Sequence, residues 1–591
     1  MASITRASLP IRDACGRAVS FSDLSLFFVY LRNTFFFFLK LSLVTVSSSL
    51  FLQVPPLRQH TQRMTDSKGP IELGVDSKFS PEPRSQSEVP DAPSVGGLDF
   101  EEYTRGGLGR HLGIFSTIFL IVGRIIGTGI FSTPSSVTSS AGSVGAALLL
   151  WVLGLLLAGA GLAVWLELGC MIPRSGGEKV YLEAVYRKPK LLITVVFAVQ
   201  AVALGFTASG CIVFASNVVL AAGRNASEWE ERGIAIAVIV SITMLHTFLP
   251  NWGVRGMNAI GVIKVILLLF IVITGWVVLS GRVSSVEDPY ASFHNSFEGS
   301  ATSSNLYATA LFKVLNSYAG WSNAAYVVNE IRNPIRTMKI AAPIGLAICG
   351  ILYLLANVAY YAAATPQEIA QSGVTVAAFF MGKVFGTAAK RALSVFVAIS
   401  AFGNVMTVTF AQARVNQELA KEGVIPFPEF WASSWPFGSP SAGLLLHFIP
   451  SFIVIVAIPF GDAYNFILDL EGYPGSVINF LVVAGLFFLR WTAAEIPRPF
   501  KVWWPVAFFF IVAQAFQLVA PFIKPPGGKG DTSLPYWLPY VIGIVVLLAG
   551  IVYWAFWQII LPSFGKYKLL PQHSVLSDGT TVVVYKKEKL I

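Results

Sequence analysis

Long apolar stretches separated by short polar connections dominate the chain from residue 112 onward. Twelve of them reach roughly the 20 residues that a helix needs to cross the hydrocarbon core of a bilayer. Helices satisfy their own backbone hydrogen bonds in lipid, so this pattern predicts an all-α polytopic membrane protein. The predicted spans are 112–138, 144–171, 191–222, 233–249, 257–280, 304–331, 338–363, 388–413, 441–459, 462–489, 503–522 and 536–560.

Two of these spans are interrupted by glycine, at Gly127-Thr128-Gly129 and at Tyr318-Ala319-Gly320. Lipid cannot bond to the N–H and C=O groups that a break frees, so such breaks persist where open backbone lines a cavity. Paired breaks in two halves of a chain point to the substrate site of a transporter. The alternative interpretation is that the glycines only allow close helix packing.

The two breaks offer complementary polar groups. N–H groups at the helix start after Gly129 favour a carboxylate, and free carbonyl groups at the second break suit an ammonium group. Together they predict a receptor for the backbone of an α-amino acid. The candidate substrate-binding residues are Ile125, Ile126, Gly127, Thr128, Gly129, Asn316, Ser317, Tyr318, Ala319 and Gly320. The side chain of the substrate is expected to contact Ser209 and Gly210 in the third span and Phe402 and Asn404 in the eighth.

Composition supports a membrane protein. Hydrophobic residues make up 54% of the chain and charged residues 13%, against about 25% in soluble domains. The basic residues that give the chain its net charge of +10 lie in the connections between apolar runs. We therefore attribute them to the positive-inside rule and not to nucleic acid binding. The connections on the side of the membrane where both tails lie contain 14 Lys and Arg residues, and those on the other side contain 8. Because the side richer in Lys and Arg is the cytoplasmic one, we expect both tails in the cytoplasm. The sequon at Asn225 then falls in an outer loop.

The chain divides into four predicted regions. Residues 64–111, rich in Pro, Ser and charge, are expected to form a disordered cytoplasmic tail. Residues 112–560 form the permease domain, and 561–591 a second cytoplasmic tail. The apolar stretch within 1–63 fits an anchor, an extra span, or a gene-model extension upstream of a start at Met64.

Enzymatic chemistry is not expected. Cys15, Cys170, Cys211 and Cys349 show neither metal-ligand nor disulfide spacing. No phosphate-binding loop occurs, and no nucleophile, base and orienting group share a segment. We therefore expect no cofactor and no metal.

The motifs GRIIGTGIF, LELGCMIPRSGGEKVYLEAVY, GWSNAAYVVNEIRNPIRT and RPFKV, in this order, resemble the amino acid–polyamine–organocation (APC) superfamily. Within it the chain is similar to L-type amino acid transporters, and most to fungal high-affinity methionine permeases, over residues 108–560. The resemblance implies two inverted five-helix repeats, segments 1–5 and 6–10, with broken helices 1 and 6, followed by helices 11 and 12. It also implies a substrate carboxylate at the GTG turn.

Charges inside the predicted membrane segments are functional candidates. The resemblance places Lys264 beside the first broken helix, where sodium-coupled relatives bind a cation, so we expect it to couple transport to protons; snorkelling is the alternative. Arg124, near the midplane, is expected to pair with backbone carbonyls, Asp469 or Glu471. Glu167 and Glu330 are candidate gating charges, with Arg174, Arg332 or Arg336 as their expected partners.

Two departures from the L-type pattern limit what the resemblance implies. Asn316 stands where those carriers often have an aromatic gate. The outer loop 223–231 lacks the cysteine that links a glycoprotein heavy chain in animal carriers, so no such subunit is expected. Lys68 and Lys78 in the amino-terminal tail are candidate ubiquitin acceptors.

We therefore expect a secondary active transporter that imports a neutral amino acid, methionine by resemblance, across the plasma membrane by alternating access and with protons. One alternative is a neutral amino acid exchanger of broad L-type specificity. Another, from a different class, is an amino acid sensor without net transport.

Overall fold

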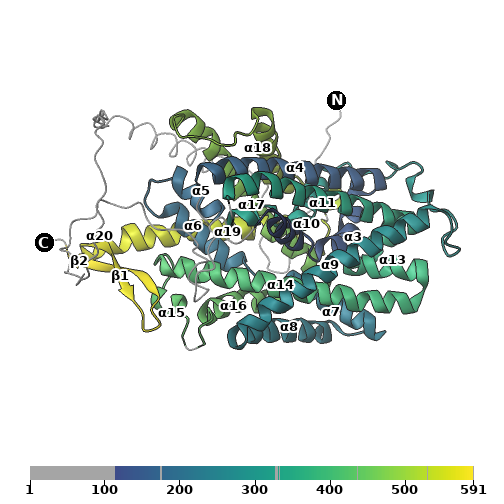
Figure 1. The fold of residues 1–591 in the computed structure, drawn as a ribbon, viewed down its shortest axis with the longest axis horizontal. Coiled ribbons are helices and arrows are strands. Elements are labelled where there is room, and N and C mark those ends of the chain that lie inside the picture. Colours follow the sequence, from purple (N-terminus) through teal and green to yellow (C-terminus); the bar gives the residue numbers. More distant parts are fainter. Residues whose placement is uncertain are drawn as a thin grey trace, which may run out of the picture. The chain divides into compact units, whose positions relative to one another are not determined.

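The computed structural model describes residues 113–172, 176–326, 331, 333–435, 437–528 and 530–589. Its long helices lie side by side, with their ends at the two ends of the view in Figure 1. The α-helices are α2 (Ile114–Ile125), α3 (Gly129–Ala141), α4 (Val144–Met171), α5 (Glu178–Val185), α6 (Leu192–Leu204), α7 (Ala208–Ala222), α8 (Glu228–Phe248), α9 (Pro250–Leu279), α10 (Ser304–Tyr318), α11 (Pro334–Ala363), α12 (Pro366–Gln371), α13 (Val376–Phe385), α14 (Thr387–Lys421), α15 (Pro428–Ala432), α16 (Ser441–Ala457), α17 (Phe460–Thr492), α18 (Trp504–Val519), α19 (Leu538–Ala555) and α20 (Leu561–Gly565). Shorter helical turns are η2 (Ala291–Phe293), η3 (Trp321–Tyr326), η5 (Gly373–Thr375), η6 (Ala520–Phe522), η7 (Pro526–Gly528) and η8 (Phe556–Ile560), and the strands are β1 (Tyr567–Val575) and β2 (Thr581–Lys589).

Nine helical segments of the described residues are long and apolar enough to cross a membrane, or ten if α2 and α3 form one bent span. The helical, multi-span class and the broken first helix are thus confirmed. Two predicted spans, 304–331 and 441–459, do not form single helices of spanning length, since α10 has 15 residues and α16 has 17.

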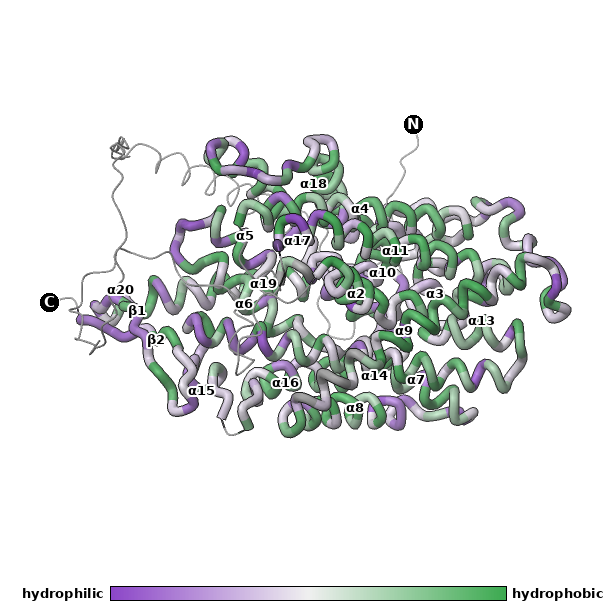
Figure 2. Tube along the Cα trace, in the orientation of Figure 1, coloured by the Kyte–Doolittle hydropathy of each residue, from purple (hydrophilic) through white to green (hydrophobic). Residues whose placement is uncertain are grey.

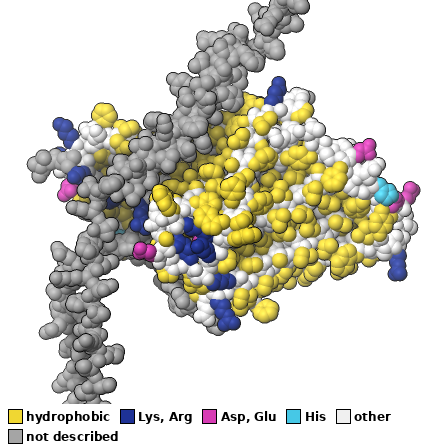
Figure 3. All heavy atoms as spheres, turned by 90° about the horizontal axis from the view of Figure 1, so that it is seen from above, with side chains coloured by type: hydrophobic (Ala, Val, Ile, Leu, Met, Phe, Trp, Pro, Cys, Tyr) yellow, Lys and Arg dark blue, Asp and Glu magenta, His cyan; other side chains and the backbone are white. Residues whose placement is uncertain are grey.

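Apolar side chains cover the outside of this helix assembly. Hydrophobic residues follow the helices, and hydrophilic residues gather toward their ends and in the connections (Figure 2). One face shows a broad field of hydrophobic side chains with charged groups at its margins (Figure 3). Ile266 and Phe508, for example, are 60% and 63% exposed. A soluble monomer rarely exposes so large an apolar surface, so these side chains are the lipid-facing ones.

Helices from distant parts of the sequence surround the first break. α11 packs against α2, α4 and α9, and α10 packs against α3 and α4. The helix α7 packs against α14. These contacts bring the two interrupted segments, α2–α3 and α10–η3, together inside the helix assembly.

The carboxyl-terminal tail, for which no structure was predicted, contains an antiparallel hairpin. β1 pairs with β2 from Tyr567 opposite Lys589 to Val575 opposite Thr581. Val582 is fully buried in an apolar cluster that includes Leu419 near the end of α14 and Val424 just after it. The hairpin is therefore docked onto the α14–α15 connection.

Several predictions lie outside the described residues. These are the division of the amino-terminal region into 1–63 and 64–111, the candidate acceptors Lys68 and Lys78, and the candidate gating charge Glu330. Asn225 is described; it is exposed in the short connection between α7 and α8.

Candidate substrate site

The first break separates α2 from α3 by three residues. α2 ends at Ile125, Ile126 has extended backbone angles, and α3 starts at Gly129 with a bend of 46°. Two tyrosines of α11 bond to carbonyl groups on either side of the break. Tyr353 donates its hydroxyl to the Ile125 carbonyl at 2.8 Å, and Tyr360 donates to the Ile130 carbonyl at 3.2 Å. Carbonyl groups beside the break that lack a partner within their own helix thus accept hydrogen bonds from tyrosines of α11.

The second break follows α10, which ends at Tyr318. Ala319 has extended ψ, Gly320 has φ +116°, and the chain continues as the short helix η3. Only glycine adopts such a φ without strain, so the residue type at 320 is set by the turn. Tyr318 is fully buried and packs edge-on against Trp151, with ring centroids 5.9 Å apart.

The two breaks lie directly against each other. A Cβ atom on Gly129 would lie 2.6 Å from Ser317 Oγ and 2.8 Å from Ser317 Cα. A Cβ atom on Gly320 would lie 2.7 Å from Arg124 Cγ. Neither gap accepts a methyl group without displacement, so both glycines are needed for close packing of the interrupted helices, as the packing interpretation expected. Close packing also brings the exposed backbone of the two breaks to one place.

A cavity of about 1160 Å³ opens at this meeting point. Ile126 and Tyr318 do not line it; both are fully buried. Phe402 also lies outside the lining and packs against Phe214, with centroids 6.0 Å apart. The predicted residues that do line the cavity are Ile125, Gly127, Thr128, Gly129, Asn316, Ser317, Ala319, Gly320, Ser209, Gly210 and Asn404. Most of the expected backbone therefore borders one space large enough for an amino acid.

The cavity extends from the breaks toward one end of the helices. There it is lined by Lys179 of α5 and by Glu418 and Glu422 at the end of α14. Lys179 is buried and forms ion pairs with Glu422 and, at 3.1 Å, with Glu183. This is the end that the distribution of Lys and Arg predicts to be cytoplasmic.

At the other end α3 is closely packed. Ser132 donates to the carbonyl of Val374 at 2.8 Å, and Ser135 donates to that of Ala370 at 2.9 Å. Thr133 shares a hydrogen bond of 2.9 Å with Tyr464. Because these bonds tie α3 to η5, α12 and α17, the structure is closed on the side opposite the cavity mouth.

Two basic groups lie beside the first break. Arg124 lines the cavity, and Lys264 of α9 is 3% exposed and within range of the Arg124 charge. The carboxylates considered as partners for Arg124 have other contacts in the structure. Asp469 forms an ion pair with Lys313, and Glu471 accepts a side-chain hydrogen bond from Asn316. Asn316, which cannot act as an aromatic gate, thus connects α10 to α17.

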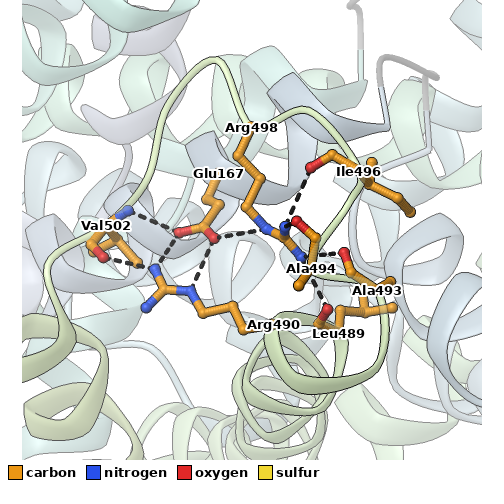
Figure 4. A network of polar contacts seen from close by, with 8 residues as sticks. All are labelled: Glu167, Leu489, Arg490, Ala493, Ala494, Ile496, Arg498 and Val502. Atoms are coloured by element: carbon orange, nitrogen blue, oxygen red, sulfur yellow. Dashed lines mark hydrogen bonds and ion pairs between the residues drawn. The ribbon is translucent and has the colours of Figure 1, made fainter.

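Glu167 lies in a different ion-pair network from the one expected. Its carboxylate accepts a hydrogen bond from Arg490 Nε at 2.9 Å and another from the Val502 backbone N–H at 2.7 Å, and Arg498 Nε lies 3.5 Å away (Figure 4). These partners, Arg490 and Arg498, were not among the expected ones, of which Arg174 and Arg332 lie outside the described residues. The network fastens α4 to the end of α17 and the segment after it.

Sequence reasoning missed two sets of residues around the site. Lys313 is fully buried in α10, and the rule that drew attention to Lys264 applies to it equally. Tyr353 and Tyr360 gave no signal, since tyrosines in an apolar helix are common. Their role depends on the position of α11 relative to the break.

Comparison with known proteins places this arrangement in a family. Residues 112–548 match the family model described as amino acid permease. The chain is 40% identical over 478 residues to the high-affinity methionine permease of Saccharomyces cerevisiae, covering 80% of this chain and 83% of that protein. It is 33% identical to the low-affinity methionine permease of the same organism, covering 81% and 88%. It is 30% identical to the b(0,+)-type amino acid transporter 1 of Mus musculus, covering 76% and 88%. The first span of this helical membrane protein is broken beside a cavity, and its sequence matches the family model along that whole region. The chain therefore belongs to the APC amino acid permease family, and it is a transporter, not an enzyme.

Proposed function

We propose that this permease imports a neutral amino acid, methionine, across the plasma membrane together with protons. The proposal rests on the meeting of two interrupted helices at one cavity, since this geometry presents backbone N–H and C=O groups to a ligand. Similarity to two methionine permeases, at 40% and 33% identity, supports the choice of amino acid.

The substrate carboxylate is placed at the start of α3, near Thr128 and Gly129. There the first backbone N–H groups of the helix have no intrahelical acceptor and carry the positive end of the helix dipole. The substrate ammonium is placed at carbonyl groups ending α2 and α10. The Ile125 carbonyl accepts one hydrogen bond from Tyr353, and its second lone pair is available to the ammonium.

The methionine side chain then extends toward Gly210 and Asn404, which line the same cavity. Asn404 lies close to the first break, since a Cβ atom on Gly127 would be 3.1 Å from its side-chain oxygen. A flexible thioether of this size fits a cavity bordered by small residues. Glycine at 210 leaves room that a larger side chain would remove.

Transport proceeds by alternating access. The chain crosses the membrane twelve times in two inverted five-helix repeats, with both tails in the cytoplasm, so the present cavity mouth at Lys179 and Glu422 faces inward. Packing of α3 against α12 and α17 closes the outer side. Lys264, buried beside the broken helix, couples the cycle to protons.

Radiolabelled methionine uptake in permease-deficient cells tests the proposal. Uptake should saturate, fall as external pH rises from 5.5 to 7.5, and be lost when an uncoupler dissipates the proton gradient. Competition with the other nineteen amino acids should show preference for unbranched apolar side chains. Uptake that survives the uncoupler but requires internal amino acid would instead establish exchange.

A further inference from the structure

A second buried ionic cluster lies outside the cavity lining. Lys313 Nζ of α10 is 3.2 Å from Asp469 Oδ1 of α17 and 2.5 Å from Asp531 Oδ2 in the connection before α19. The side chains of Lys313, Asp469 and Asp531 are 0%, 3% and 10% exposed. Lys313 donates hydrogen bonds to Asp469 Oδ1 and, at 3.4 Å, to the carbonyl of Thr309, and its contact with Asp531 is an ion pair.

The formal charges in this cluster do not balance. Among the described residues, one ammonium faces two carboxylates, which leaves one negative charge uncompensated in a buried site. In the part of the chain that the structure describes, the other titratable groups beside it are Tyr540 of α19, whose hydroxyl bonds to Thr309 at 3.2 Å, and Tyr473 of α17, and phenols supply no positive charge. Among described residues the neighbouring surface is apolar, formed by Phe312, Tyr473 and Phe522.

A net buried charge is costly, because the interior solvates it poorly. Two carboxylates that share one site relieve this cost by sharing one proton. With that proton the cluster is neutral: one ammonium, one carboxylate and one carboxylic acid. The proton comes from the solution at this end of the protein and adds to a carboxylate oxygen without breaking any other bond.

The position of the cluster makes the proton relevant to conformation. Lys313 lies five residues before the break at Tyr318, and α10 approaches this break from the side opposite the cavity mouth. Asp531 belongs to a connection that Ser533 ties to Asp462 at the start of α17, through its backbone N–H at 3.0 Å. Closure of this end therefore buries the cluster, and opening exposes it to water.

We infer that Lys313, Asp469 and Asp531 form a proton-binding latch that holds the outer end closed. Protonated, the neutral cluster packs between α10, α17 and the 530–537 connection. Deprotonated, its excess negative charge requires water, so the outer end opens. External acid thus favours closure and higher external pH favours opening. The inference builds on the proposed transport cycle by adding a second proton site, separate from Lys264.

Labelling of one introduced cysteine, measured above the labelling of the parent chain with its four native cysteines, reports the latch without transport. Ser303→Cys in the full-length chain is suitable, since Ser303 is 8% exposed at the start of α10 and the exchange is nearly isosteric. A membrane-impermeant maleimide is applied to intact cells at external pH 5.5 to 8. Ser284→Cys, exposed in the preceding connection, corrects for the pH dependence of thiol reactivity.

The corrected labelling of the Ser303→Cys chain should rise with external pH, approaching about tenfold for each pH unit below the midpoint, and should level off above it as the cluster becomes fully deprotonated. Adding Asp531→Asn or Asp469→Asn makes the cluster neutral without a proton. Either change should keep labelling low and independent of pH. Asp462→Asn is the matched control: it removes a carboxylate charge that contacts the same connection, leaves the charge of the cluster unchanged, and should retain the pH dependence.

Labelling that does not change with pH in the parent background would overturn the latch, as would an unchanged pH dependence in both asparagine variants. These results do not depend on methionine. If the parent chain fails to take up methionine at any pH while its labelling shifts as described, the proposed substrate is wrong and the latch stands.

Discussion

Replacing Gly129 with alanine tests how closely the two broken helices must approach. The new Cβ atom would lie 2.8 Å from Ser317 Cα, whereas ordinary contacts begin at 3.4 Å, so the two backbones must separate by about 0.6 Å at a minimum. Overpacking of this kind costs about 1–3 kcal/mol. If the displacement falls on the substrate site, that cost corresponds to a loss of affinity of about 5- to 160-fold.

The assay is the concentration dependence of methionine uptake, with the amount of protein at the cell surface measured in parallel. We expect the apparent KM to rise about fivefold or more while surface protein stays within about twofold of the parent. Gly159→Ala is the control, because no atom lies within 4 Å of a Cβ at that position. Adding Ser317→Gly removes two of the three obstructing atoms and should restore part of the affinity. A Gly129→Ala carrier with the parent KM would refute the argument that helix contact at the break sets substrate affinity.

Three further changes test other parts of the molecule. Lys264→Ala removes a buried ammonium beside the broken helix, so uptake should be lost or lose its dependence on external pH; the same profile from pH 5 to 8 would exclude a coupling role. Glu167→Gln leaves two arginines without their buried carboxylate, which should lower the free energy of unfolding by about 3–5 kcal/mol and so lower the Tm of the detergent-purified protein. Glu230→Gln, in an exposed ion pair, is the control and should leave the Tm unchanged. Val582→Asp places a carboxylate in an apolar cluster and should make the carboxyl-terminal hairpin sensitive to trypsin, whereas Val575→Asp, at a position 69% exposed, should not.

The helical class and the first break could be predicted because each leaves a local signal. A bilayer requires long apolar runs, and glycine marks the residues where a helix is interrupted. The contact between Gly129 and Ser317 left no such signal. It depends on how α3 packs against α10, which a single sequence does not specify.

Ion-pair partners were the least predictable feature. Glu167 meets Arg490, which lies 323 positions later, and the choice among many arginines depends on which helix ends coincide in space. Lys313 could have been found, since a lysine in an apolar span is a functional candidate without further information. Its two aspartate partners could not, because Asp531 lies in a connection whose fold has no periodic pattern. The hairpin was missed for a different reason: its strands follow a long series of helices, and most of their residues are exposed, so no regular alternation of apolar and polar residues marks them.

Three tyrosines of α11 give that helix an unusual position in the molecule. Tyr353 and Tyr360 bond to backbone on either side of the first break, and Tyr361 shares a hydrogen bond of 2.6 Å with Thr138 of α3. The opposite surface of α11 carries side chains such as Ile344 and Ile351, which are 43% and 58% exposed and face the hydrocarbon. The helix α11 therefore contacts lipid acyl chains on one surface and bonds to the broken part of the first span on the other. Reconstitution in bilayers of different thickness or sterol content should consequently alter ligand affinity even though no lipid touches the ligand.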